Sequence, residues 1–504
     1  MAGIYFIKQY KRWWLLLFLL PCCNRSIGRT TYTYQYNSEC AKAYEQYMSL
    51  HISEADAILR QSIIRNPYNL MNTYLADYDD YLSLLLNGDK KDYEQRSAHM
   101  DERLDLLANG DEHSPWYKLC KAGIYLHWAM IHMRFGENMK AAFQLRRSYV
   151  LLKENQEQFP GFQYNIFFYG LERTVIGTVP DDYKWLASIF GLKGNVREGI
   201  EKIDVFINTH SSDDLFQREA VAIDCFLKFY LLYKQEDVWK YLSSAQFPTQ
   251  NNLINTFVKG NMAVNYRKAD IAIQTFKEGS AINDFNKFPL FEYQFGCAYF
   301  FKMDAACIDH FKVFLNKYQG KLYVKDTWYK MALFYYIEGN MQQANYCREQ
   351  ITKRGNTIMD ADRTAGRFGE HDRWPNINLL RAHLLIDGGY YKQAYDILNA
   401  VNEQSLQSIS DKLEYNFRMG RVCDELGEKE RALSLYQKTL NMGRNERDYF
   451  AARSALQMAF IYEKAGDNKN ALAKYNECLG IHHHDFQSAI DQQAKAGVNR
   501  LTVK

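Results

Sequence analysis

Four copies of one pattern run through the C-terminal half of the chain. In each copy a small residue is followed by an apolar or thiol residue at +3, a glycine at +7 and an alanine at +12. The copies are Ala332, Tyr335, Gly339, Ala344; Ala382, Leu385, Gly389, Ala394; Gly420, Cys423, Gly427, Ala432; and Ala459, Tyr462, Gly466, Ala471. A helical hairpin of this length cannot bury its apolar face alone, so neighbouring copies must stack. The repeat therefore predicts an elongated array of helix pairs.

Each position of the pattern has a physical role. The small residue lets two antiparallel helices approach closely, and the glycine ends the first helix where a positive φ is needed. The alanine begins the contact face of the second helix, and an aromatic residue four positions later, such as Tyr436 or Tyr475, lies on the same face. With only 8 prolines but 38 tyrosines and 30 phenylalanines, the composition also favours long packed helices.

The pattern resembles the tetratricopeptide repeat (TPR). This resemblance implies an all-α, right-handed superhelical solenoid of antiparallel helix pairs with a C-terminal capping helix. Weaker copies contain Gly296 with Cys307 and Gly260 with Ala272. The alanines at 394, 432 and 471 are 38 or 39 positions apart, compared with a usual spacing of ~34, so we expect slightly extended helices or connections.

Five segments follow from this interpretation. Residues 1–23 are expected to be a signal peptide, 24–210 an irregular helical-hairpin half, 211–286 divergent TPR-like helices, 287–480 the TPR array and 481–504 the capping helix. Within the irregular half, Ser114 is expected to cap a helix that starts with Pro115 and turns at Gly136. An insertion over 353–374 is expected to form a solvated loop.

The N-terminus has the pattern of a secretory signal. Three basic residues, Lys8, Lys11 and Arg12, precede an apolar run over 13–20 that is too short to span a bilayer. The pattern predicts an exported protein, periplasmic or outer-membrane-associated. Cys22 or Cys23 is a possible lipidation site that would tether the chain to a membrane, although Pro21 precedes them where a small residue is preferred. An uncleaved or a cytosolic chain is the alternative.

Glycines 177, 191, 194 and 199 interrupt the helical pattern, together with Pro180. They match neither phosphate-binding motif, GxxxxGK[ST] or GxGxxG, so we interpret the segment as a corner. Pro180 is expected to start a short helix that buries one side through Tyr183, Trp185, Leu186 and Phe190.

The same segment is similar to the central part of the inclusion-body-clearance / TPR-domain-39 family, with Gly170, Pro180, Gly191, Gly194 and Gly199 at comparable places. The resemblance covers about forty residues and implies a non-enzymatic helical protein. The export signal departs from that largely intracellular family, so its cellular role is not carried over.

Few residues suggest a catalytic, metal-binding or nucleic-acid-binding site. The ten cysteines form no CxxC pair, and three adjacent histidines in "GIHHHDF" would point in different directions on a helix. The net charge of +3 comes with no basic cluster beyond the N-terminus. The sequence therefore predicts no cofactor, no metal site, no nucleic-acid partner and no catalytic site, and leaves disulfides open.

In the TPR family, the concave face of each first helix often holds peptides. Carried onto the four copies, this face contains Tyr329, Tyr336, His383, Asp387, Phe417, Arg421, Asp424, Phe460 and Lys464. These residues are aromatic or of both charges, without the basic clamp that would select acidic peptide ends. For each single aromatic residue, structural packing is the favoured interpretation.

The resulting hypothesis is a non-catalytic scaffold that binds a protein or peptide partner, in the cell envelope. A SusD-like glycan-binding surface lipoprotein is the alternative, although its long loops rich in Pro, Gly and Asn are missing. An enzyme with an unrecognised site is the third possibility.

Overall fold

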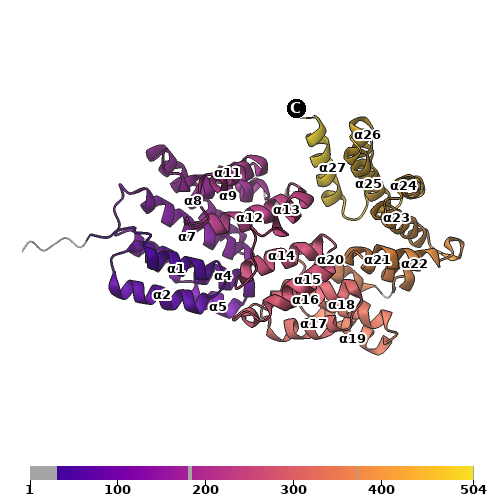
Figure 1. Ribbon diagram of the computed structural model, residues 1–504, viewed down its shortest axis with the longest axis horizontal. Helices are drawn as coiled ribbons and strands as arrows, with labels where there is room; N and C mark the ends of the chain where they lie inside the picture. Colours follow the sequence, from indigo (N-terminus) through magenta and orange to yellow (C-terminus); the bar gives the residue numbers. More distant parts are fainter. Residues whose placement is uncertain (1–30, 180–183, 372, 503–504) are drawn as a thin grey trace, which may run out of the picture.

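The computed structural model describes residues 31–179, 184–371 and 373–502 (Figure 1). These residues form helices α1 to α27 and no strand, apart from one isolated bridge between Thr33 and Asn69. The predicted all-α solenoid of paired helices is confirmed. The signal peptide, Cys22, Cys23, Pro180 and Tyr183 lie outside the described residues.

The first part of the chain packs helices of unequal length. It comprises α1 (Ser38–Tyr47), α2 (Ile52–Arg65), α3 (Leu70–Leu75), α4 (Asp77–Asn87), α5 (Lys90–Arg96), α6 (His99–Leu107), α7 (Pro115–Arg134), α8 (Asn138–Gln158), α9 (Tyr164–Gly177), α10 (Lys184–Ile189) and α11 (Val196–Thr209). The start of α7 is as predicted, because the Ser114 side chain accepts a hydrogen bond from the backbone N–H of Trp116 and Pro115 occupies the first turn.

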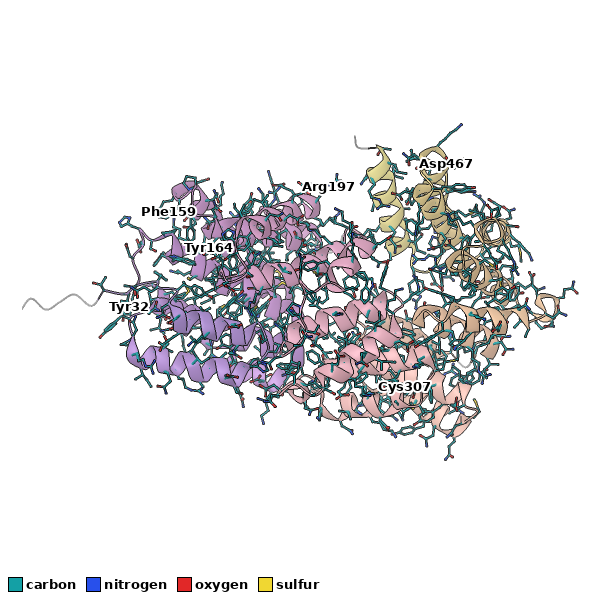
Figure 2. All side chains as sticks on the ribbon, viewed as in Figure 1. Tyr32, Phe159, Tyr164, Arg197, Cys307 and Asp467 are labelled. Carbon is teal, nitrogen blue, oxygen red and sulfur yellow. The ribbon has the colours of Figure 1, made fainter. Side chains whose placement is uncertain are left out.

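The second part contains the regular hairpins. It comprises α12 (Gln217–Tyr230), α13 (Gln235–Leu242), α14 (Leu253–Asn265), α15 (Ala269–Gly279), α16 (Leu290–Lys302), α17 (Ala306–Lys317), α18 (Val324–Ile337), α19 (Met341–Lys353), α20 (Asp360–Glu370), α21 (Ile377–Gly388), α22 (Tyr391–Asn399), α23 (Ile409–Glu425), α24 (Lys429–Gly443), α25 (Phe450–Lys464), α26 (Asn468–Leu479) and α27 (Gln487–Thr502). Figure 1 shows the chain advancing from α1 and α2 at one end to α21 and α22, after which α23 to α27 turn away from this direction. Cys307 in the α16–α17 hairpin and Asp467 at the tip of the α25–α26 hairpin are labelled in Figure 2.

The turn glycines of the four repeats have the conformation that the pattern predicts. Gly339, Gly389, Gly427 and Gly466 have φ between +76° and +88°. Only a residue without a Cβ adopts this conformation at no steric cost. In two of the hairpins the next residue, Asn340 or Asp467, caps the second helix through its side chain.

Small residues on the first helices lie against aromatic rings on the second helices. A Cβ added to Gly260 would be 2.3 Å from the Phe276 ring, and one on Gly420 would be 2.8 Å from the Tyr436 ring. The capping helix α27 makes the same kind of contact, because a Cβ on Gly497 would be 2.2 Å from the Tyr475 ring. The aromatic residues therefore fix the distance between paired helices.

The glycine-rich corner is a close helix contact. A Cβ on Gly199 of α11 would be 2.6 Å from the carbonyl oxygen of Gly170 in α9, and one on Gly194 would be 2.1 Å from the Gly177 nitrogen. These contacts support the interpretation of this segment as a corner between packed helices. One detail was wrong: Trp185 is not buried but 56% exposed. Phe190 is half-buried, with its ring 4.8 Å from the ring of Phe143.

The insertion over 353–374 is not a solvated loop, because its centre forms helix α20. Asp362 of this helix is fully buried and accepts hydrogen bonds from the backbone N–H groups of Tyr323 (2.6 Å) and Asp326 (3.0 Å). The insertion thereby caps the N-terminus of α18. The repeat pattern could not predict this contact, because Asp362 lies far along the chain from the N–H groups that donate to it.

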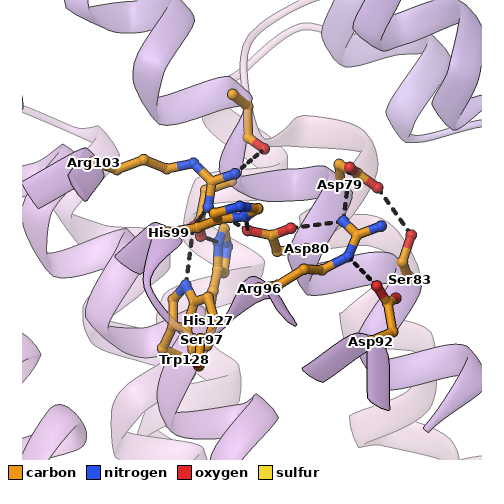
Figure 3. A network of polar contacts seen from close by, with 12 residues as sticks. Asp79, Asp80, Ser83, Asp92, Arg96, Ser97, His99, Arg103, His127 and Trp128 are labelled. Atoms are coloured by element: carbon orange, nitrogen blue, oxygen red, sulfur yellow. Dashed lines mark hydrogen bonds and ion pairs between the residues drawn. The ribbon is translucent and has the colours of Figure 1, made fainter. Parts of the chain in front are cut away.

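A buried ion network crosses the N-terminal part (Figure 3). Asp80 is fully buried and contacts Arg96 and Arg103. Asp77 is also fully buried and accepts hydrogen bonds from His127 (2.8 Å) and Trp128 (3.1 Å). Figure 3 shows these side chains converging from separate helices. The network satisfies buried charges between α4, α5, α6 and α7.

The eight described cysteines are all buried and unpaired. Within the described ranges, no helix is both long and apolar enough to cross a membrane. No group of three or more His, Cys, Asp or Glu residues in this part of the chain is placed to hold a metal ion.

Candidate functional site

Four of the nine predicted concave-face residues line one cavity. This cavity, of about 270 Å³, has walls from α21, α23 and α25, the turn before α15 and the start of α27. The predicted residues in it are His383, Asp387, Phe417 and Arg421. Asp424 lies beside it, 3.7 Å from Arg421.

The remaining predicted residues lie elsewhere. The ring of Tyr329 packs 4.8 Å from Phe368, and that of Tyr336 stacks 4.7 Å from Trp374. Both tyrosines are therefore held by the insertion. Phe460 packs against Tyr475 at 5.9 Å, and Lys464 is exposed at the end of α25. For these aromatic residues the packing alternative fits the structure better than a free recognition surface.

The cavity is rich in arginine, although the concave face was predicted to lack a basic clamp. Arg267, Arg418 and Arg453 line it together with Arg421, and we call these four residues the arginine pocket. Arg418 and Arg421 are three positions apart on α23 and so lie on the same side of the helix. Arg453 comes from α25.

The turn before α15 is held in place by its neighbours. A Cβ on Gly389 would be 2.2 Å from the carbonyl oxygen of Arg267, so α21 can approach this turn only through a glycine. The turn between α14 and α15 is thus brought against the end of α21. Arg267 is distant in sequence from the other three arginines, and only this packing places it in the pocket.

Three of the arginines have acidic neighbours. Arg418 contacts Glu414 at 3.2 Å, and Arg421 contacts Glu425 at 2.7 Å. Arg267 is 3.8 Å from the same glutamate. These carboxylates lie on the helix surface beside the cavity and do not line it.

Arg453 differs from the other three. Its side chain donates a hydrogen bond to the amide oxygen of Gln493 at 3.1 Å, and no carboxylate in the described part of the chain lies within ion-pair distance of it. Burial, followed by repulsion from Arg421 and Arg267, lowers the pKa of Arg453 to about 10. The pocket thus holds a positive charge that the protein itself does not neutralise.

The lining contains one carboxylate, Asp387, and it is already engaged. Its oxygen is 3.1 Å from the Nε2 atom of His383. Burial opposes ionisation of Asp387, but His383 and nearby arginines hold its pKa below the usual range. With four arginines and a single engaged carboxylate, the pocket is suited to bind an anionic group.

Aromatic rings surround the charged centre. Phe417, Tyr449 and Phe486 line the same cavity, and Phe486 is 42% exposed. The rings of Tyr449 and Phe486 meet edge to face at 5.3 Å. An anionic group that enters the pocket would therefore place its apolar neighbours against these rings.

No protein-family model and no curated protein sequence matches the chain. Two solved structures align over most of its length. The first is "Crystal structure of APC/C hetero-tetramer Cut9-Hcn1", with 12% identity, a TM-score of 0.27 and coverage of 91% of this chain and 95% of that chain. The second is "Structure of Naa15/Naa10 bound to HypK-THB", with 12% identity, a TM-score of 0.20 and coverage of 87% and 68%. TM-scores this low carry no information on the site.

Proposed function

We propose that the protein is a non-catalytic scaffold whose arginine pocket binds an acidic side chain of a protein partner. The observation that carries this proposal is the unneutralised charge of Arg453, next to Arg421 and Arg267. Clustering like charges destabilises the free protein, and an anion in the pocket removes that cost.

The size of the arginine pocket and its aromatic rim favour a segment of another protein as the anionic ligand. The cavity of about 270 Å³ holds one or two side chains, and its aromatic rim suits an apolar residue beside the acidic one. A nucleic acid would instead need an extended basic face to follow its phosphates, whereas the whole chain has a net charge of only +3.

Affinity capture tests the proposal. Tagged wild-type chain and the Arg453→Gln variant are each used to capture proteins from native cells after membrane extraction, and stoichiometric partners are identified by mass spectrometry. We expect a partner with wild type that is lost with Arg453→Gln. The matched control is Arg197→Gln on α11, an exposed arginine that is 3.9 Å from Glu201, which should retain the partner. Equal capture by both variants would refute a role for the pocket.

We further propose a cell-envelope location, supported only by the basic and apolar pattern of residues 8–20 and by Cys22 and Cys23. The same capture experiment tests it, because the N-terminal peptide of the bait reports cleavage and lipidation. An intact N-terminus on a cytosolic chain would refute both export and a membrane tether. The SusD-like alternative has less support, since Tyr329, Tyr336 and Phe460 pack against other rings.

A further inference from the structure

A second and larger cavity lies at the junction of the N-terminal part and the middle helices. It has a volume of about 490 Å³ and lies between the end of α1, the loop before α12 and the loop before α14. The backbone N–H of Leu253 donates to the carbonyl oxygen of Ser49 at 3.2 Å, which fixes two walls that are distant in sequence. This volume is in the range of small-molecule sites.

The lining is polar but almost free of net charge. Seven carboxamide side chains line the cavity, among them Gln46 of α1, Gln217 of α12 and Asn255 of α14. The two charged residues in the lining, Glu45 and Arg218, form an ion pair with each other at 3.0 Å. An ionic ligand would therefore find no unpaired charge here, unlike in the arginine pocket.

Gln217 provides a buried and unused acceptor. The residue is only 8% exposed, and its Nε2 atom donates to the carbonyl oxygen of Ile207 at 2.9 Å. Its Oε1 atom has no hydrogen-bond partner among the described residues. Gln217 lines the cavity, so a small rotation of its side chain brings this acceptor to a ligand bound there.

Apolar groups share the walls with the amides. Ile207, Val221 and Phe247 line the cavity beside the carboxamides. A carboxamide presents a donor and an acceptor side by side, which complements neighbouring hydroxyl groups that each donate and accept. The apolar side chains complement C–H surfaces. A ligand with hydroxyl edges and C–H faces fits this combination.

We propose that this cavity, which we call the amide pocket, binds a short neutral saccharide. The carboxamides hydrogen-bond to the ring hydroxyls, with Gln217 Oε1 accepting one of them, and the apolar wall packs against a ring face. The proposal is independent of the arginine pocket, because the two cavities share no residue.

Isothermal titration calorimetry on the full chain tests the proposal. The probes are maltotriose, cellotriose and triacetylchitotriose, with triasparagine as a neutral peptide and triglutamate as a charged one. We expect at least one saccharide to bind at concentrations below about 10 mM, and the Gln217→Leu variant to weaken it about tenfold or more. Gln274→Leu, an exposed glutamine on α15, is the matched control and should bind as wild type does.

A second variant covers the case in which Gln217→Leu does not fold. The Gln46→Ala, Gln250→Ala double variant changes one half-buried and one exposed residue of the lining and should weaken binding of the same saccharide. Three outcomes would overturn the proposal: no saccharide binding, saccharide binding that both pocket variants retain, or binding of triasparagine alone. The Arg453→Gln variant should bind the saccharide as wild type does, which separates this test from that of the proposed function.

Discussion

Gly420 of α23 lies directly against the ring of Tyr436 of α24. A Cβ added to Gly420 would be 2.8 Å from Cε1 and 2.9 Å from Cδ1 of that ring, closer than side-chain atoms normally approach. Tyr436 is fully buried, so its ring cannot move aside without disturbing the core. The repeat pattern thus encodes a direct contact between a small residue and an aromatic residue.

This contact predicts that Gly420→Ala destabilises the protein by about 1–3 kcal/mol, through overpacking against Tyr436. Urea denaturation followed by circular dichroism measures the change. Gly480→Ala is the control, because its Cβ would approach backbone oxygens only to 3.5 Å, and its effect should be within about 0.5 kcal/mol. Equal effects of the two substitutions would contradict the packing argument.

The insertion provides a second prediction. Asp362→Ala removes the acceptor for the N–H groups of Tyr323 and Asp326 and should cost about 1–2 kcal/mol. Hydrogen exchange of these two amides should become faster. Asp360→Ala changes an exposed acidic residue of the same helix, with 80% of its side chain accessible, and should leave their exchange unchanged. Unaltered exchange in Asp362→Ala would show that α20 does not cap α18.

A buried carboxyl group predicts a pH dependence. Glu172 of α9 is fully buried, and no residue in the described part of the chain hydrogen-bonds to its carboxyl oxygens. Burial raises the pKa of Glu172 from 4.5 to about 8. The folded state therefore binds the proton more tightly than the unfolded state does, and ionisation weakens folding progressively as the pH rises from 4.5 to 8.

We therefore expect Glu172→Gln to be more stable than wild type by on the order of 2–4 kcal/mol at pH ~9, with the difference shrinking toward pH ~5. Urea midpoints across this pH range measure it. Glu157→Gln replaces an exposed glutamate of α8, with 67% of its side chain accessible, and should show no such trend. A stability difference for Glu172→Gln that does not change with pH would contradict the assignment.

The arginine pocket predicts a trade-off between stability and binding. The pKa of Arg453 is lowered to about 10, so its charge is disfavoured in the folded state at every pH below that value, and this cost disappears only as the pH rises above 10. Arg453→Gln removes the repelled charge and should stabilise the free protein by about 1–3 kcal/mol at pH ~7. Thermal unfolding at low salt measures the gain. A lower melting temperature than that of wild type would contradict this prediction.

The sequence was sufficient to predict the helical array, because turn glycines such as Gly427 and small-to-aromatic contacts such as Gly420 with Tyr436 are local and periodic. It was not sufficient for α20. The role of Asp362 depends on backbone groups that lie 36 and 39 positions away in the chain. Trp185 was expected to be buried because it lies in an apolar stretch, but hydrophobicity alone does not determine which side of a short helix faces a neighbour.

The candidate site was predictable only in part. His383, Asp387, Phe417 and Arg421 were predicted because the TPR resemblance places them on the concave face of α21 and α23. Arg267 could not be found, since it enters the pocket through the contact of its turn with Gly389. Arg418 could have been predicted from its spacing, because a residue three positions before Arg421 lies on the same side of α23.

The measurement that tests the central claim most directly is calorimetric titration of the protein with hexaglutamate, using hexaglutamine as the neutral control. We predict that hexaglutamate binds with one-to-one stoichiometry and more weakly as salt is added, and that hexaglutamine does not bind. Arg453→Gln should weaken binding about tenfold, and Arg197→Gln should leave it unchanged. The absence of hexaglutamate binding, or equal affinity for the Arg453→Gln and Arg197→Gln variants, would contradict an anion-binding arginine pocket.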